Sequence, residues 1–165
     1  MVIKLEHIFT NEGAVLPFDF YLDLSGVSIG ANKPFTKPFK VEGKVFNKTD
    51  VVKMKATAVT TMHTTCDRCA CDYDERFEVP IEHVLVLTLN DESNDDFLLL
   101  EDMRLELEPL ITEDILLELP SKILCKNDCK GLCITCGKNL NNGQCSCQKP
   151  IDPRLEALKQ LLDNQ

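Results

Sequence analysis

The sequence predicts an α+β protein, mainly β, with an antiparallel sheet or a partly open barrel, one or two helices and a cysteine-rich C-terminal module. Three observations predict this class: alternating apolar and polar residues in the first half, two helix-like segments in the second, and nine cysteines, of which six fall within residues 124–147. A chain of 165 residues can enclose one apolar core of ordinary size. We therefore expect one β-rich domain with a smaller appendage.

Four segments of the first half have the composition and two-residue period of strands. Residues 17–25 alternate phenylalanine or leucine with polar residues, and residues 39–47 and 51–64 are rich in β-branched residues and separated by a short turn, which predicts a hairpin. Residues 76–89 form a further strand, and Pro80 places it at a sheet edge or on a bulge. The turn before this strand carries the first three cysteines, at the tip of a predicted hairpin.

Two helices are expected in the second half. Residues 106–120 carry apolar residues at three- to four-residue spacing and end at Pro120, which predicts about three helical turns. Near the C-terminus, Asp152 and Pro153 precede a leucine stripe that predicts a capped helix. The expected division is a β-rich domain over 1–119 with an acidic loop and a helix, a cysteine-rich module over 120–150, and a C-terminal helix over 151–165.

The net charge of -9 comes from one part of the chain. Residues 91–118 hold eleven acidic residues and one arginine, whereas the rest has 16 acidic and 17 basic residues. We interpret this segment as a solvated loop and the polar face of a helix, with an acidic partner-binding arm as the alternative. No apolar run has the length of a signal peptide or a membrane span, so we expect a cytoplasmic protein that does not bind membranes.

Clustered thiols in a reducing compartment are more often metal ligands or catalytic groups than disulfides, and an odd number of cysteines leaves one unpaired in a disulfide framework. A structural zinc ion takes four ligands, usually as two closely spaced pairs. The last four cysteines supply two such pairs joined by a turn-forming connector, which predicts a first zinc site at Cys133, Cys136, Cys145 and Cys147.

The remaining pairs predict a second zinc site at Cys66, Cys69, Cys125 and Cys129, with Cys71 left over. In the alternative, Cys66 and Cys69 are free thiols on a loop, and Cys125 or Cys129 ligates together with the last cluster. The expected cofactor is thus one zinc ion or two, in a zinc-stapled module.

The residues predict no enzyme and no small-molecule substrate. A redox CxxC pair should open a helix after a strand, and here the first pair lies between strands; an iron–sulfur cluster fits the short knuckles less well than zinc. Three histidines, His7, His63 and His83, fall in segments expected as strands and outside the cysteine clusters, so an open catalytic zinc site is not indicated. A thiol redox or metal-responsive protein that uses the CxxC pair is the alternative function.

Basic residues surround the later cysteines. Residues 121–150 contain five lysines and one acidic residue, and Lys126, Lys130, Lys138 and Arg154 are candidate contacts to nucleic acid or a protein partner. Four thiolates around one zinc ion carry a net charge of about -2, so the lysines also serve to offset them. Aromatic residues, on which single-stranded bases stack, do not occur between Ser121 and Gln165.

The sequence resembles the YceD family of bacteria and plastids, the large ribosomal RNA subunit accumulation proteins. The matching strings are CDRC in the first half, LLELP followed by LCKNDCKGLCITCGKNLNNGQCSC, and finally IDPRLEALKQLL. They resemble the branch with the C-terminal cysteine cluster, and Cys71 belongs to no part of the motif.

The resemblance implies a non-enzymatic ribosome-biogenesis factor that supports accumulation of large-subunit ribosomal RNA. Its expected partner is ribosomal RNA or a ribosome-assembly protein. The resemblance also marks Cys66 and Cys69 as the paired cysteines of the first motif, and Asp152, Pro153 and Arg154 as the start of the last one.

Overall fold

The computed structural model describes residues 1–29, 32–88 and 97–147 of the chain. Contacts between residues divide the chain into two compact units. The first unit contains residues 1–64 and 73–121, and the second contains residues 65–72 and 122–165. The predicted division at residues 119 and 150 stays a prediction, and the predicted C-terminal helix lies outside the described residues.

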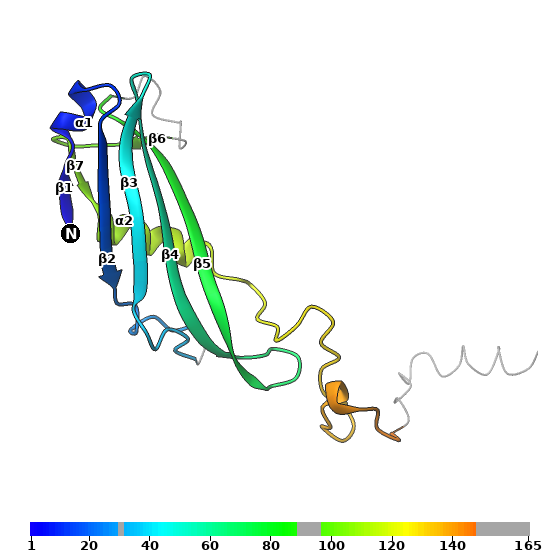
Figure 1. The fold of residues 1–165 in the computed structure, drawn as a ribbon. Coiled ribbons are helices and arrows are strands. Elements are labelled where there is room, and N and C mark those ends of the chain that lie inside the picture. The colour runs from blue at the N-terminus through cyan, green and yellow to red at the C-terminus, as the bar shows by residue number, and fades with distance from the viewer. Residues whose placement is uncertain (30–31, 89–96, 148–165) are drawn as a thin grey trace, which may run out of the picture. The chain divides into compact units, whose positions relative to one another are not determined.

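An open five-stranded sheet forms the main part of the first unit, with the strand order β2-β3-β4-β5-β6 (Figure 1). Its strands are β2 (Val15–Leu22), β3 (Phe39–Lys48), β4 (Val51–Thr65), β5 (Asp72–Val86) and β6 (Phe97–Leu99). β3 pairs antiparallel with both β2 and β4, whereas β5 and β6 are parallel. The predicted mainly β α+β class is confirmed, as an open sheet and not a barrel.

A two-residue turn connects β3 to β4 and fixes the register of this pair. Lys48 lies opposite Val51, and the two turn residues between them, Thr49 and Asp50, have φ angles of 56° and 60°. Positive φ at both central positions is the geometry that matches the twist of a hairpin. Aspartate tolerates this region better than most residues, whereas the β-branched Thr49 adopts it only with strain.

The apolar core lies between one face of the sheet and helix α2 (Leu107–Leu117), which crosses behind the strands in Figure 1. Along β4 every even-numbered residue from Val52 to Thr64 is buried, as expected for a strand with one buried face. The helix contributes Leu107, Ile111 and Ile115, which are fully buried at four-residue spacing. On the side of β5, His83 Nε2 lies 2.9 Å from Asp114 Oδ2 of the helix.

A second, two-stranded sheet closes one end of the core. β1 (Val2–Lys4) pairs antiparallel with β7 (Arg104–Glu106), and the short helix α1 (Glu6–Thr10) follows β1. Asn47 of β3 donates a buried side-chain hydrogen bond to the carbonyl of Ile8, which attaches α1 to the main sheet. His7 lies in α1, so the expectation of a strand there was wrong; the five-residue segment is too short for a recognisable pattern.

The four predicted strands and the predicted helix of the first unit are confirmed, with shifts at their ends. Among the described residues, β6 pairs only with Val84, Leu85 and Val86 of β5, so Pro80 has no described strand on that side. This agrees with the expected edge position. None of the helices in the described ranges is long and apolar enough to cross a membrane.

Gly43 provides a test of how closely the sheet is packed. A Cβ atom added there would lie 2.6 Å from Phe18 Cζ and 2.7 Å from the carbonyl oxygen of Lys55, which belongs to the backbone and cannot easily move away. We expect Gly43→Ala to lower the free energy of unfolding by about 1–3 kcal/mol, measured by chemical denaturation. Gly26→Ala is the control, because nothing lies within 4 Å of an added Cβ there. Equal stability of the two variants would contradict this packing.

Candidate metal centre

Four cysteines that are distant in sequence meet in the second unit. Cys66 and Cys69 belong to the turn between β4 and β5, and Cys125 and Cys129 follow helix α2. Their Sγ atoms all lie within 4.8 Å of one another, and three of the four residues are buried. The structure thus brings together the four residues predicted to form one of the two zinc sites. Two of them, Cys66 and Cys69, lie at the predicted hairpin tip.

The sulfur positions in this first cysteine set (Cys66, Cys69, Cys125 and Cys129) fit a tetrahedral ion. Cys66 Sγ lies 3.8 Å from Cys129 Sγ, and Cys69 Sγ lies 3.6 Å from Cys125 Sγ. Four thiolates at the usual Zn–S distance of about 2.3 Å form a tetrahedron with edges of about 3.8 Å. All four thiols are free. The set can therefore hold a metal ion, and its spacing suits zinc.

The second cysteine set consists of Cys133, Cys136, Cys145 and Cys147, whose Sγ atoms also lie within 4.8 Å of one another. None of its members is buried, whereas the first set is mostly enclosed. A connector between the two pairs contains the short 3-10 helix η1 (Leu140–Asn142) and brings the second pair back to the first. The two sets therefore offer the same ligands in different environments.

Both CxxC turns have the same backbone geometry. The N–H of Ala70 donates to the carbonyl of Cys66 at 2.9 Å, and the N–H of Gly137 donates to the carbonyl of Cys133 at 2.8 Å. Ala70 and Gly137 each follow the second cysteine of their pair and have positive φ angles of 52° and 70°. Glycine adopts this region without strain, whereas alanine does so at a cost of about 1 kcal/mol.

The connector of the second set also contacts the first set. Asn141 Nδ2 donates to Cys129 Sγ at 3.3 Å, while its Oδ1 accepts from the N–H of Lys130 at 3.0 Å. Asn139 Nδ2 donates to the sulfur of Cys71 at 3.0 Å, and Asn139 Oδ1 accepts from Asn141. The sequence alone predicts only a turn for this connector. Side-chain amides that orient metal ligands are typical of metal sites, but no spacing rule reveals them in a sequence.

Arg68 joins the hairpin tip to the segment after Cys129. Its guanidinium donates to the carbonyl of Cys129 at 3.1 Å, and its own carbonyl accepts from the N–H of Leu132 at 3.1 Å. Asp67 adds two hydrogen bonds with Ile123, one through its N–H and one through its carboxylate. These contacts hold the two halves of the first set together, and no motif or spacing in the sequence predicts them.

The pKa values of the thiols in the first set shift in opposite directions, because backbone N–H groups favour ionisation of some thiols while burial and neighbouring sulfurs oppose it in others. Burial acts to raise the pKa of Cys66, but N–H groups of Cys125, Cys69 and Arg68 outweigh it and lower the pKa to about 6. The side chain of Asn141 lowers the pKa of Cys129. For Cys69 the backbone N–H of Cys71 acts to lower the pKa, but burial and the three neighbouring sulfurs raise it to about 12. Burial raises the pKa of Cys125.

The second set shows the same division. N–H groups of Cys136 and Thr135 lower the pKa of Cys133 to about 6, whereas the neighbouring sulfur of Cys136, followed by burial, raises the pKa of Cys147 to about 12. In both sets, therefore, some thiols ionise readily and then oppose the ionisation of the others. A bound cation removes this opposition, because a coordinating thiol is deprotonated outright.

The candidate contact lysines are exposed in the second unit, and two of them have partners within it. Lys138 Nζ donates to the carbonyl of Gln144 at 3.0 Å, and Lys126 lies 3.9 Å from a carboxylate oxygen of Asp128. Lys130 contributes its backbone N–H to Asn141. Arg154 lies outside the described residues. The role of these side chains in recognising a partner stays a prediction.

These features define a β-rich protein with a cysteine-rich module that has two sets of four thiols, each positioned to hold a metal ion. Residues 54–162 match the model of the family described as "Large ribosomal RNA subunit accumulation protein YceD". The chain therefore belongs to the YceD family, and the resemblance noted from its motifs is confirmed.

The chain is also similar to a protein of Bacillus subtilis (strain 168) named "Uncharacterized protein YlbN". The two are 30% identical over 128 residues, which cover 76% of this chain and 74% of that protein. No solved structure matches the chain. The family match begins within β4 and includes all nine cysteines, so both sets lie inside the matching region.

Gly131 lies between the two sets and gives a test of this geometry. It has a φ angle of 73°, and an added Cβ would lie 3.0 Å from the carbonyl oxygen of Arg68. Gly137 has a similar φ of 70° with nothing within 4 Å, so it is the matched control. We expect Gly137→Ala to destabilise the module by about 1 kcal/mol and Gly131→Ala by about 2–4 kcal/mol, because the contact with Arg68 adds to the same conformational cost. The midpoint of thermal unfolding of the full chain reports both losses, and equal losses would contradict the contact with Arg68.

Proposed function

We propose that this protein supports the accumulation of large-subunit ribosomal RNA during ribosome assembly, and that it acts by binding and not by catalysis. The observation that carries the proposal is the family match over residues 54–162, since the family is described by this role. The matched region contains both cysteine sets, so the module is the part of the chain that we assign to the function.

In this proposal each cysteine set holds one zinc ion with a structural role. Four thiolates leave no open position for a substrate or a reactive water, unlike the three-ligand sites of catalytic zinc. The hydrogen bonds from Asn141 to Cys129 and from Arg68 to the carbonyl of Cys129 support this role, because they fix the ligand loops. When bound, zinc supplies the positive charge that lets the crowded thiolates coexist.

The module would present its exposed surface to ribosomal RNA or to a ribosome-assembly protein. The lysines lie around the sets, and Lys130 and Lys122 are exposed with no ion pair among the residues that the structure describes. The second CxxC turn also exposes Ile134, which is 83% accessible. An apolar tip beside basic side chains suits a partner that offers both phosphate and apolar surface.

The metal content can be measured directly. From protein purified without an affinity metal we expect two zinc ions per chain, one for each cysteine set, and one titratable thiol, that of Cys71. Zinc can contribute about 10 kcal/mol or more to the folding of such modules, so Cys133→Ser should lose one ion and disorder residues 133–147, which contain the other three ligands of that ion. Elemental analysis and amide nuclear magnetic resonance spectra check these outcomes.

Cys71→Ser is the control, because Cys71 belongs to neither set and its replacement should leave both ions bound. Spectra that stay unchanged after Cys133→Ser or after chelation would contradict a structural role for the metal. A metal-free protein with a reversible disulfide between Cys66 and Cys69 would instead support a thiol redox function.

The cellular role has a separate test. In cells depleted of this protein we expect large-subunit ribosomal RNA to fall relative to small-subunit RNA, as measured by RNA blotting. The wild-type chain and Cys71→Ser should restore the ratio. Cys66→Ser should not, because it removes one of the four cysteines of the first cysteine set. An unchanged ratio after depletion would overturn the proposed function. Crosslinking in cells followed by sequencing then shows whether large-subunit RNA is the direct contact or an assembly protein mediates it.

A further inference from the structure

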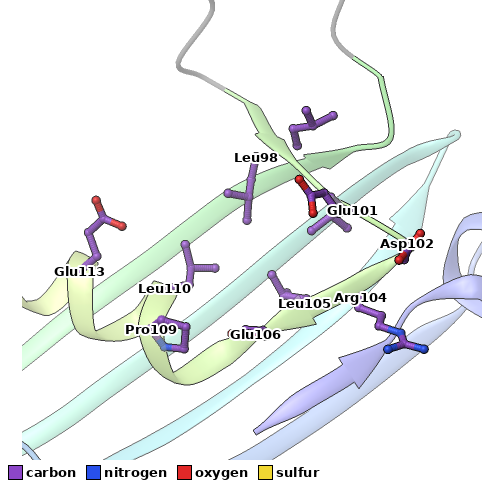
Figure 2. A pocket seen from close by; sticks show the side chains of 11 residues that line it. Leu98, Glu101, Asp102, Arg104, Leu105, Glu106, Pro109, Leu110 and Glu113 are labelled. Atoms are coloured by element: carbon purple, nitrogen blue, oxygen red, sulfur yellow. The ribbon is translucent and has the colours of Figure 1, made fainter.

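A hollow of about 460 Å³ opens on the first unit, between β6, β7 and the beginning of α2 (Figure 2). Its apolar lining comes from three elements: Leu98 from β6, Leu105 from β7 and Leu110 from α2. Leu105 is buried, while Leu98 and Leu110 are half-buried and pack against the core. The hollow therefore has an apolar floor that is part of the folded core and does not depend on the second unit.

Acidic side chains surround this floor. Glu101, Asp102, Glu106 and Glu113 line the hollow, against a single basic residue, Arg104. In the described part of the chain none of the four carboxylates forms an ion pair, although Glu42, Glu78, Glu82 and Glu108 all do so elsewhere. The carboxylates are thus available for cationic groups of a partner, and they would repel the phosphates of a nucleic acid.

The charges are spread around the rim and do not converge on one point. Within residues 1–29, 32–88 and 97–147, only the two cysteine sets bring three or more possible metal ligands together. A single divalent ion therefore does not fit these carboxylates. Several cationic groups carried on a chain fit them better, because each can reach a different carboxylate.

The adjacent strand favours a polypeptide as the occupant. β6 is the last strand of its sheet and pairs only with β5 among the described residues, so its outer edge offers backbone groups for an added strand. Leu99 of this strand is 48% exposed. An extended segment alongside β6 would place alternate side chains toward the hollow and toward solvent.

We propose that this hollow is a docking site for an extended basic segment of a partner protein. An aliphatic side chain of the segment enters the floor formed by Leu98, Leu105 and Leu110, and flanking lysine or arginine side chains pair with the four carboxylates. The acidic character of residues 91–118 then includes a binding surface and not only solvated charge. The proposal goes beyond the ribosomal role, because it concerns the first unit and requires no metal.

Fluorescence anisotropy of the full chain with a labelled peptide tests the proposal. The probe is a peptide of about ten residues, in which lysine and arginine alternate with serine around one central leucine. We expect saturable binding that weakens as salt is added, because exposed ion pairs are screened. The variant E101Q/E106Q/E113Q should weaken binding about tenfold, since each exposed pair contributes roughly a factor of two to five.

Two comparisons separate a specific site from general attraction. The control E6Q/E12Q/E42Q removes the same number of charges outside the hollow and should bind the peptide nearly as well as the wild-type chain. A peptide with serine in place of the central leucine should bind several-fold more weakly. Methyl signals of Leu98 and Leu110 should shift when the original peptide is added.

Equal weakening by the two triple variants would overturn the proposal, because it would show that overall charge alone attracts the peptide. Equal affinity of the leucine and serine peptides would also overturn it, because the apolar floor would then be unused. Shifts of the Leu98 and Leu110 methyl signals when an oligouridine RNA is added to the chain without any peptide would assign the hollow to nucleic acid and contradict a protein partner.

Discussion

Repulsion between crowded thiolates is the constraint on which the cysteine-rich unit depends. Four sulfurs within 4.8 Å of one another cannot all carry a negative charge unless a cation lies among them. Without a cation, this repulsion appears as opposite pKa shifts: the pKa of Cys66 is lowered and that of Cys69 is raised. Among the described residues of this unit the buried apolar side chains are cysteines, so a bound metal would supply the cohesion that an apolar core gives to the first unit.

The hydrogen bonds of this unit show how the two cysteine sets support each other. Asn139 and Asn141 belong to the connector of the second cysteine set, yet their amides donate to the sulfurs of Cys71 and Cys129. If the connector lost its order, Cys129 of the first cysteine set would therefore lose the hydrogen bond from Asn141. Cys71, which belongs to neither set, accepts a hydrogen bond from Asn139, and the hydroxyl of the control variant Cys71→Ser can accept it as well.

Sequence analysis could predict the long elements and the grouping of cysteines, and it failed where the pattern is short or three-dimensional. β3 and β4 are ten and fifteen residues long, so their alternation is unmistakable. β1, β6 and β7 have three residues each, too few to show a period. The cysteine grouping followed from ligand number and pair spacing. The roles of Arg68 and of the amide donors could not be predicted from the sequence, because they depend on contacts between distant segments. The positive φ of Ala70 could not be predicted either, because alanine normally avoids this conformation.

The separation of the ligands along the chain has a consequence for the order of assembly. Cys133, Cys136, Cys145 and Cys147 lie within 15 consecutive residues, whereas Cys66 and Cys129 are 63 residues apart. Closing the longer loop costs about 1 kcal/mol more in chain entropy, and it also requires β5 and α2 to be in place. If both sets bind metal as proposed, the ligands of the second cysteine set can meet without the rest of the chain, whereas those of the first cysteine set meet only once the intervening chain has folded. A metal ion bound by the first cysteine set would therefore indicate that the chain between its ligands has folded.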